Sequence, residues 1–203
     1  MRKPKLRELA EALKVLFIRG PYTSSFPKEP HVPPESFRGK PQYDEKECIG
    51  CGACARVCPA RAIEVIDDPQ TGKRTLLLNY GICIFCGQCH AYCTTSDGIR
   101  QTAEYDLATL DRSQTVEKVE KDLVLCEYCG GVIGTREHLR WIAERLGAQA
   151  YANSTLILAA VESDATIAAA APRDPATPGI RSDLMRVLCP TCRRNVFLTE
   201  EWK

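Results

Sequence analysis

The sequence predicts an α+β fold with two metal-binding parts, and three observations support this prediction. Two cysteine runs of identical spacing lie 35 positions apart, measured from Cys48 to Cys83, with a predicted β-hairpin between them. A smaller set of cysteines forms two C-x2-C pairs in the last 80 or so residues. Apolar residues repeat with helical spacing near the N-terminus and again after the first of these pairs.

The composition limits the class of protein. A chain of 203 residues holds one or two domains, and 44% apolar and 26% charged residues are ordinary for a globular protein. The net charge of +1 gives no general attraction to nucleic acid or to a strongly acidic partner. All 12 cysteines fall in C-x2-C or C-x3-C steps, which favours metal thiolates in a reducing compartment over a disulfide framework. We expect neither a secretory signal nor a membrane span.

Residues 1–20 are predicted to form an amphipathic helix. Leu6, Leu9, Leu13 and Leu16 follow helical spacing, and lysine and arginine residues lie between them. Such a helix suits a membrane interface or a membrane subunit, and it equally suits packing on its own domain. One short helix is a weak membrane anchor when it acts alone.

Residues 21–45 are predicted to be an extended, proline-rich lead-in. The segment contains six prolines and few long apolar residues, so it is poorly suited to building a core. We expect it to lie over the domain that follows or over a partner protein.

Residues 46–105 contain the two long cysteine runs, each with the spacing C-x2-C-x2-C-x3-C. This spacing holds two [4Fe–4S] clusters in a bacterial-type ferredoxin, and the fourth cysteine of each run serves the other cluster because it cannot reach its own. Zinc is a poor alternative since zinc sites use two pairs of ligands. An imidazole ligand from His90 is disfavoured because four thiolates are available for each cluster. The predicted ligands are Cys48, Cys51, Cys54 and Cys93 for cluster I, and Cys83, Cys86, Cys89 and Cys58 for cluster II.

The residues around the runs fit this prediction, with one departure. Residues 62–66 and 75–78 are expected to pair as a hairpin around a turn at 68–72. Pro59 follows Cys58 as the ferredoxin pattern requires, whereas Thr94 follows Cys93. Thr94 offers a hydroxyl that can bond a cluster sulfur, so the departure affects the potential of cluster I more than its ligation.

Residues 120–203 are predicted to form a second, zinc-ribbon-like or rubredoxin-like domain. A helix is expected at 135–147, and the apolar run 156–160 suits a strand. Residues 168–178 suit a loop and residues 180–188 a second helix. Residues 101–122, which precede this domain, are polar and expected to be partly helical. Two cysteine pairs clamp one tetrahedral metal, for which structural Zn²⁺ is the first choice and a single iron the second, with an empty or disulfide-bonded site as a further alternative. The four expected ligands are Cys126, Cys129, Cys189 and Cys192.

Four stretches, residues 23–30, 37–41, 48–54 and 83–89, resemble the two-cluster iron–sulfur subunit of membrane-bound group 4 [NiFe] hydrogenases, as in formate hydrogenlyase. That subunit is related to the ferredoxin-like subunit of respiratory complex I. The resemblance covers residues 5–100 well and 120–195 loosely. The C-terminal cysteine pairs are similar to the formate hydrogenlyase version and are absent from ordinary complex I subunits.

The resemblance implies an electron-relay subunit that is itself non-catalytic and belongs to an oxidoreductase complex. An electron-input iron–sulfur protein or ferredoxin would reduce one cluster, and the other would pass the electron to the hydrogenase small subunit and on to the nickel–iron centre of the large subunit. The chain would be cytoplasmic and peripheral, on the inner face of the membrane beside an ion-pumping membrane arm.

Three other functions stay open at this point. As an alternative to the hydrogenase subunit, the chain could be the equivalent subunit of a complex I-like quinone or sulfur reductase. A free two-cluster ferredoxin is less consistent with the lead-in and the extra metal domain. A regulatory or nucleic-acid-binding module is disfavoured by the near-neutral charge and the lack of a basic stripe interleaved with aromatic residues.

Overall fold

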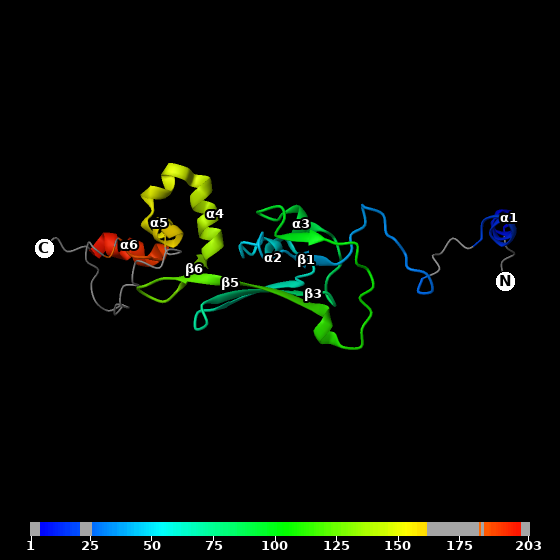
Figure 1. The fold of residues 1–203 in the computed structure, drawn as a ribbon, viewed down its shortest axis with the longest axis horizontal. Coiled ribbons are helices and arrows are strands. Elements are labelled where there is room, and N and C mark those ends of the chain that lie inside the picture. Colours follow the sequence, from blue (N-terminus) through cyan, green and yellow to red (C-terminus); the bar gives the residue numbers. More distant parts are fainter. Residues whose placement is uncertain (1–4, 21–25, 162–182, 184, 200–203) are drawn as a thin grey trace. The chain divides into compact units, whose positions relative to one another are not determined.

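The computed structural model describes residues 5–20, 26–161, 183 and 185–199. It divides the chain into an N-terminal unit that ends at Phe37 and a larger unit that begins at Arg38 (Figure 1). Among the residues that the structure describes, no helix combines the length and the apolar character needed to span a membrane.

The N-terminal unit contains the predicted amphipathic helix. Helix α1, Leu6–Lys14, continues as a π-helical turn, Val15–Arg19, and stops at Gly20, whose positive φ of 70° ends the helix. No residue of either helical segment is buried, so the leucine face of α1 is exposed in this structure.

The larger unit is built on a four-stranded antiparallel sheet of order β2-β3-β5-β6. Strands β2, Ile63–Asp68, and β3, Lys73–Asn79, form the predicted hairpin. Strand β5, Val116–Leu125, pairs with β3 over its first part and with β6, Val132–Thr135, at its end. The sheet thus runs without a break from the cysteine repeat into the C-terminal part.

The expectation that residues 101–122 are partly helical holds only for one short turn, and the end of the segment is a strand. A single 3-10 turn, Arg112–Thr115, precedes β5, and the rest of the segment after it is strand. Charged residues fill most outward positions of β5 and hide its alternation in the sequence. Strand pairing decides that this segment is a strand, because Val119 lies opposite Leu76 and both residues are 1% exposed.

The two cysteine runs lie in loops on one side of this sheet. Each loop leads into a short helix, α2, Ala53–Val57, or α3, Gln88–Ala91. A glycine in the left-handed region precedes each helix, with φ of 77° at Gly52 and 78° at Gly87. The repeat seen in the sequence is therefore a repeat of backbone conformation.

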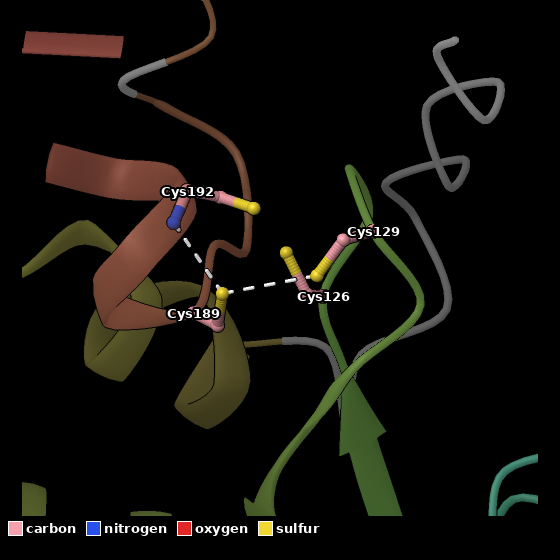
Figure 2. A group of neighbouring side chains, drawn as sticks. All are labelled: Cys126, Cys129, Cys189 and Cys192. Carbon is pink, nitrogen blue, oxygen red and sulfur yellow. Dashed lines mark hydrogen bonds between the residues drawn. The ribbon is translucent and has the colours of Figure 1, made fainter. Parts of the chain in front are cut away.

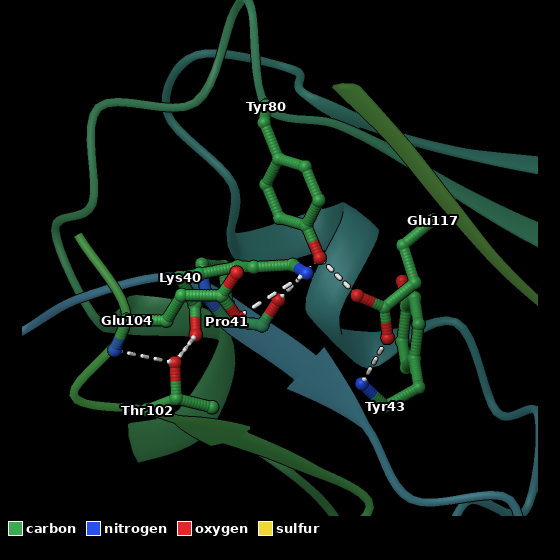
Figure 3. Close-up of polar contacts among 7 residues, drawn as sticks. All are labelled: Lys40, Pro41, Tyr43, Tyr80, Thr102, Glu104 and Glu117. Atoms are coloured by element: carbon green, nitrogen blue, oxygen red, sulfur yellow. Dashed lines mark hydrogen bonds and ion pairs between the residues drawn. The ribbon is translucent and has the colours of Figure 1, made fainter. Parts of the chain in front are cut away.

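The end of the lead-in belongs to the larger unit. Strand β1, Pro41–Tyr43, pairs with β4, Ile99–Gln101. The Tyr80 hydroxyl lies 2.8 Å from the Pro41 carbonyl and also contacts the Glu117 carboxylate, which accepts from the Tyr43 N–H at 2.7 Å (Figure 3). These bonds tie β1 to β5.

The C-terminal part is mainly helical. It contains α4, Arg136–Leu146, a 3-10 segment, Gly147–Ala152, α5, Ser154–Val161, and α6, Pro190–Thr199. The helix predicted at 135–147 is confirmed. The loop predicted at 168–178 lies outside the described residues, as do Ile180, Arg181, Ser182 and Leu184 of the helix suggested at 180–188.

The strand suggested at 156–160 is wrong, because these residues belong to α5. Asn153 caps the helix by accepting the N–H of Thr155 at its side-chain oxygen, 3.1 Å away. Leu156 and Ala159, three positions apart, are buried in a cluster with Leu139 of α4. A short apolar run is compatible with either conformation, and here the cap and helical spacing prevail.

Candidate metal centres

The first cavity beside the sheet contains sulfur atoms from both cysteine runs. Its wall includes Cys48, Cys51 and Cys54 of the first run and Cys93 of the second. Leu76 of β3 also lines this cavity and is 1% exposed. The structure therefore brings together the four residues named above for cluster I.

The second cavity has the complementary set. Cys83, Cys86 and Cys89 line it together with Cys58 of the first run. Leu78, two positions along β3 from Leu76, lines this cavity and is likewise 1% exposed. Each run thus contributes three cysteines to one cavity and its fourth to the other.

Both cavities suit a [4Fe–4S] cluster by their donor chemistry. Each offers four thiols and an apolar floor, and the exposed His90 side chain lines neither cavity. Peptide N–H groups point at the sulfurs, with Ala62 N–H 3.2 Å from Cys58 Sγ and Phe85 N–H 3.4 Å from Cys83 Sγ. Amide donors of this kind stabilise the negative charge of a bound cluster.

Hydroxyl groups surround the first cavity. Thr94 Oγ1 lies 3.2 Å from Cys51 Sγ, which confirms the expectation that this residue can bond a sulfur. Thr95 Oγ1 lies 3.5 Å from Cys93 Sγ, and the Tyr43 hydroxyl lies 4.0 Å from Cys54 Sγ. Beside a metal-bound thiolate, the Thr94 and Tyr43 hydroxyls would act as donors, whereas the Thr95 hydroxyl donates to the Glu47 carbonyl, 2.9 Å away.

In the second cavity the corresponding side-chain contact is an amide. Gln101 Nε2 lies 3.8 Å from Cys89 Sγ. Tyr43 and Gln101 gave no signal in the sequence, because neither lies near its cysteine along the chain. The β1–β4 pairing, with Tyr43 opposite Ile99, brings both residues to the cavities.

Burial keeps the Cys54 and Cys89 thiols protonated when no metal is bound. It raises the pKa of Cys54 to about 12 and that of Cys89 to about 11. Iron must therefore displace protons when it binds, and this displacement couples cluster assembly to pH.

The four C-terminal cysteines form a third group. Their Sγ atoms all lie within 4.8 Å of one another, and Cys129 Sγ is 3.8 Å from Cys189 Sγ (Figure 2). A tetrahedral ion with metal–sulfur bonds of about 2.3 Å places its sulfurs about 3.8 Å apart. The spacing therefore fits a single tetrahedral ion.

Two different structures supply these ligands. Cys126 and Cys129 lie in the turn between β5 and β6, whereas Cys189 and Cys192 lie at the N-terminal end of α6. Burial raises the pKa of Cys126, but peptide N–H donors from Cys189, Cys129 and Tyr128 outweigh it and set that pKa at about 7. A thiolate is thus accessible here near neutral pH, which favours metal binding.

Comparison with known proteins agrees with this geometry. Residues 47–97 match the family model described as 4Fe-4S dicluster domain. The matched segment thus contains all eight cysteines of the two cavities.

Relatives extend the similarity beyond the dicluster domain. NAD(P)H-quinone oxidoreductase subunit I of Gloeobacter violaceus is 39% identical over 102 residues, 47% of this chain and 48% of that protein. Formate hydrogenlyase subunit 6 of Escherichia coli is 38% identical over 117 residues, 58% of this chain and 64% of that protein. The match therefore spans about half to two thirds of the length of these relatives.

A solved structure, described as the membrane-bound sulfane sulfur reductase, an archaeal respiratory membrane complex, also matches. One chain of it is 33% identical, with 57% of this chain and 61% of that chain covered and a TM-score of 0.39. The resemblance to the iron–sulfur subunits of formate hydrogenlyase and of complex I-like enzymes is confirmed by the two curated relatives.

Proposed function

We propose that this chain is the electron-relay subunit of a membrane-bound oxidoreductase complex and holds two [4Fe–4S] clusters. The observation that carries the proposal is the pair of four-cysteine cavities inside one domain. Leu76 and Leu78 line different cavities from the same strand, and residues two apart on a strand are about 7 Å apart. Two clusters held in these neighbouring cavities would exchange single electrons.

The proposed ligands follow the crossed arrangement. Three cysteines of each run hold one cluster, and the fourth holds the cluster of the other run. When bound, the clusters supply the one-electron carriers. The protein holds them, excludes water with the apolar residues of β3 and aims amide and hydroxyl donors at the sulfurs. The two sets are Cys48, Cys51, Cys54 and Cys93 for cluster I, and Cys83, Cys86, Cys89 and Cys58 for cluster II.

We further propose that the partners are those of a formate hydrogenlyase-type complex. The 38% identity to its subunit 6 supports this assignment. The electron would enter from an iron–sulfur protein or ferredoxin and leave to the small subunit of a [NiFe] hydrogenase. The chain would lie on the cytoplasmic face of the membrane, where the exposed apolar face of α1 meets the membrane arm.

A complex I-like quinone reductase is the second candidate. It is supported by the 39% identity to NAD(P)H-quinone oxidoreductase subunit I. The two candidates share the relay and differ in the large subunit that consumes or supplies the electrons.

For the C-terminal cysteines we propose one structural Zn²⁺ in a zinc-ribbon-like or rubredoxin-like four-sulfur site. The mutual Sγ distances below 4.8 Å support a single ion, and tetrahedral thiolate sites accept zinc or iron. Joining the β5–β6 turn to the start of α6, the ion would stabilise the helical part of the chain.

Metal analysis and EPR of anaerobically purified full-length chain test the relay. We expect about eight iron atoms and one zinc per chain, with two interacting [4Fe–4S] signals on reduction. Cys93→Ala should abolish the cluster I signal and Cys58→Ala the cluster II signal. A chain with no paired cluster signal would refute the proposal, whereas a ninth iron with no zinc would reassign the C-terminal site.

Purification of the tagged chain from native membranes tests the partners. We expect a large subunit that contains nickel to copurify in a complex released only by detergent. A large subunit without nickel, together with quinone-reductase activity, would favour the second candidate. A chain that is isolated alone from the soluble fraction would contradict both.

A further inference from the structure

Thr135 links the C-terminal helical part to the first ligand loop. It is the last residue of β6 and is fully buried. Its hydroxyl donates to the carbonyl of Ile49, 2.5 Å away and 86 positions earlier in the chain. Ile49 lies directly after Cys48, in the backbone that curls around the first cavity.

The peptide group between Ile49 and Gly50, which accepts this bond, also lies beside the predicted cluster ligand Cys48. The Ile49 carbonyl and the Gly50 N–H belong to one planar peptide group, so a bond to one fixes the direction of the other. Burial raises the pKa of the Cys48 thiol, and the neighbouring Gly50 N–H opposes this shift. A donor on the carbonyl polarises the amide and strengthens its N–H as a donor. The Thr135 hydroxyl therefore acts on Cys48 through one peptide.

Packing against Thr135 also explains why position 50 is glycine. A Cβ on Gly50 would lie 2.8 Å from Thr135 Cγ2 and 3.0 Å from Lys121 Cγ. Phe85 holds the same place in the second run and keeps a side chain at a φ of 53°, close to the 66° of Gly50. The second run tolerates a side chain at this strained φ, and at position 50 the close approach of Thr135 and Lys121 adds a steric reason for glycine.

Lys121 holds the same loop from β5. Its side chain is 10% exposed, and its ammonium donates to the carbonyl of Glu45, 2.5 Å away. The same ammonium lies 3.9 Å from the Glu137 carboxylate at the start of α4. The loop before Cys48 and the loop after it are therefore both bonded to the β5–β6–α4 segment, which also delivers Cys126 and Cys129.

The second ligand loop has no such contact in the described part of the chain. The Phe85 N–H contacts Cys83 as the Gly50 N–H contacts Cys48. No described side chain bonds the Ile84 carbonyl, the counterpart of the Ile49 carbonyl, and the Ile84 side chain is 62% exposed. The second loop can therefore serve as an internal control for the effect of Thr135 on the first.

We propose that Thr135 is a positioning residue for cluster I. Through this residue the C-terminal four-cysteine site is coupled to cluster I, and cluster II stays independent of that site. This inference rests on the proposed two-cluster function. The Thr135 hydroxyl orients the 49–50 peptide toward the Cys48 sulfur, and the metal at Cys126 and Cys129 would hold the turn that leads into β6, the strand that ends at Thr135.

Potentiometric EPR on the full-length, cluster-loaded chain tests the proposal. Thr135→Val removes the hydroxyl and keeps the shape, so we expect the midpoint potential of cluster I to fall while that of cluster II stays at the wild-type value. Thr135→Ser keeps the hydroxyl and should restore the cluster I potential. Thr71→Val, at an exposed turn, is the matched control and should shift neither cluster.

Two further variants separate positioning from loss of folding. Gly50→Ala should disturb cluster I, and Gly50→Ala with Thr135→Ser should recover part of the wild-type signal because the methyl that the new Cβ meets is gone. Phe85→Ala should leave cluster I unchanged. Cys129→Ser should release the C-terminal metal and lower the cluster I potential in the same direction as Thr135→Val.

The outcomes distinguish this inference from the proposed function. If the wild-type chain has no paired cluster signals, the proposed function fails and the inference fails with it. If the wild type has both signals and Thr135→Val shifts neither cluster or both equally, the inference alone is overturned. Loss of the metal in Cys129→Ser without any change at cluster I would overturn the coupling.

Discussion

The two ligand loops share their cysteine spacing and much of their backbone conformation, yet different groups surround them. The first cavity has hydroxyl contacts to Cys51, Cys93 and Cys54, and the first loop is bonded to the C-terminal part through Ile49. The second cavity has peptide N–H contacts and one long side-chain contact, from the Gln101 amide, and its loop carries exposed apolar residues. A repeat that specifies two equal ligand sets therefore builds two unequal sites.

An arginine stabilises each loop, and here too the loops differ. Arg74 donates to the Gly50 carbonyl, 3.0 Å away, and its side chain is 13% exposed and paired with Asp67. Arg38 donates to the Cys86 carbonyl, 2.8 Å away, from an exposed position. The first loop is thus held by buried groups of the sheet, and the second by a side chain at the surface.

Shortening the two buried leucines of β3 should have the largest effect and tests whether the two cavities are separate. Leu76→Ala and Leu78→Ala should each cost about 2–5 kcal/mol of unfolding free energy, since each removes a buried leucine and leaves a cavity. Leu76→Ala should also expose cluster I, and Leu78→Ala cluster II, because the two side chains line different cavities. Denaturant unfolding and the rate of iron release to a chelator measure both effects. Equal release from both clusters in both variants would contradict two separate cavities.

The sequence predicts what local spacing encodes. The two cysteine runs, the 63–79 hairpin and the helix at 136–146 follow from patterns within a few residues of one another. The apolar run at 156–160 is too short for its period to separate strand from helix, and the Asn153 cap decides for helix.

Features set by tertiary pairing could not be predicted in this way. Strand β5 owes its conformation to β3, whose residues lie more than 35 positions earlier. Tyr43, Gln101 and Thr135 reach the ligand loops only through strand pairing, so no motif announces them. Thr94 is the exception, because it departs from a pattern that normally has proline at its position, and this departure pointed to its hydroxyl.

Removal of the Thr94 hydroxyl should have a smaller effect that sharpens the contrast between the clusters. A donor at 3.2 Å from Cys51 Sγ stabilises the extra electron of a reduced cluster. Thr94→Val should therefore lower the cluster I potential by about 40 mV, the equivalent of roughly 1 kcal/mol for one electron. Gln101→Leu should lower the cluster II potential less, because its contact with Cys89 is 3.8 Å long. Redox titration followed by EPR measures both shifts, and a larger shift for Gln101→Leu would reverse the ranking.

The Asp67–Arg74 pair should make the smallest contribution, and its pH dependence has a definite sign. Arg74 holds both carboxylate oxygens of Asp67, at 2.6 and 2.8 Å, and this hydrogen bonding lowers the Asp67 pKa below 3.8. A carboxyl whose pKa falls on folding adds stability above its unfolded pKa of about 3.9, and that stability is lost only as the pH falls through the lower folded value. Asp67→Asn should thus lower the free energy of unfolding by roughly 0.5–1 kcal/mol. The loss should be the same at pH 8 and at pH 5.5, because the carboxylate is ionised in both the folded and the unfolded state at these pH values. Denaturant unfolding of both proteins at these two pH values tests this. A cost that shrinks markedly by pH 5.5 would mean that Arg74 does not hold the carboxylate in its ionised form, and that the first loop relies on Arg74 less than its bond to the Gly50 carbonyl implies.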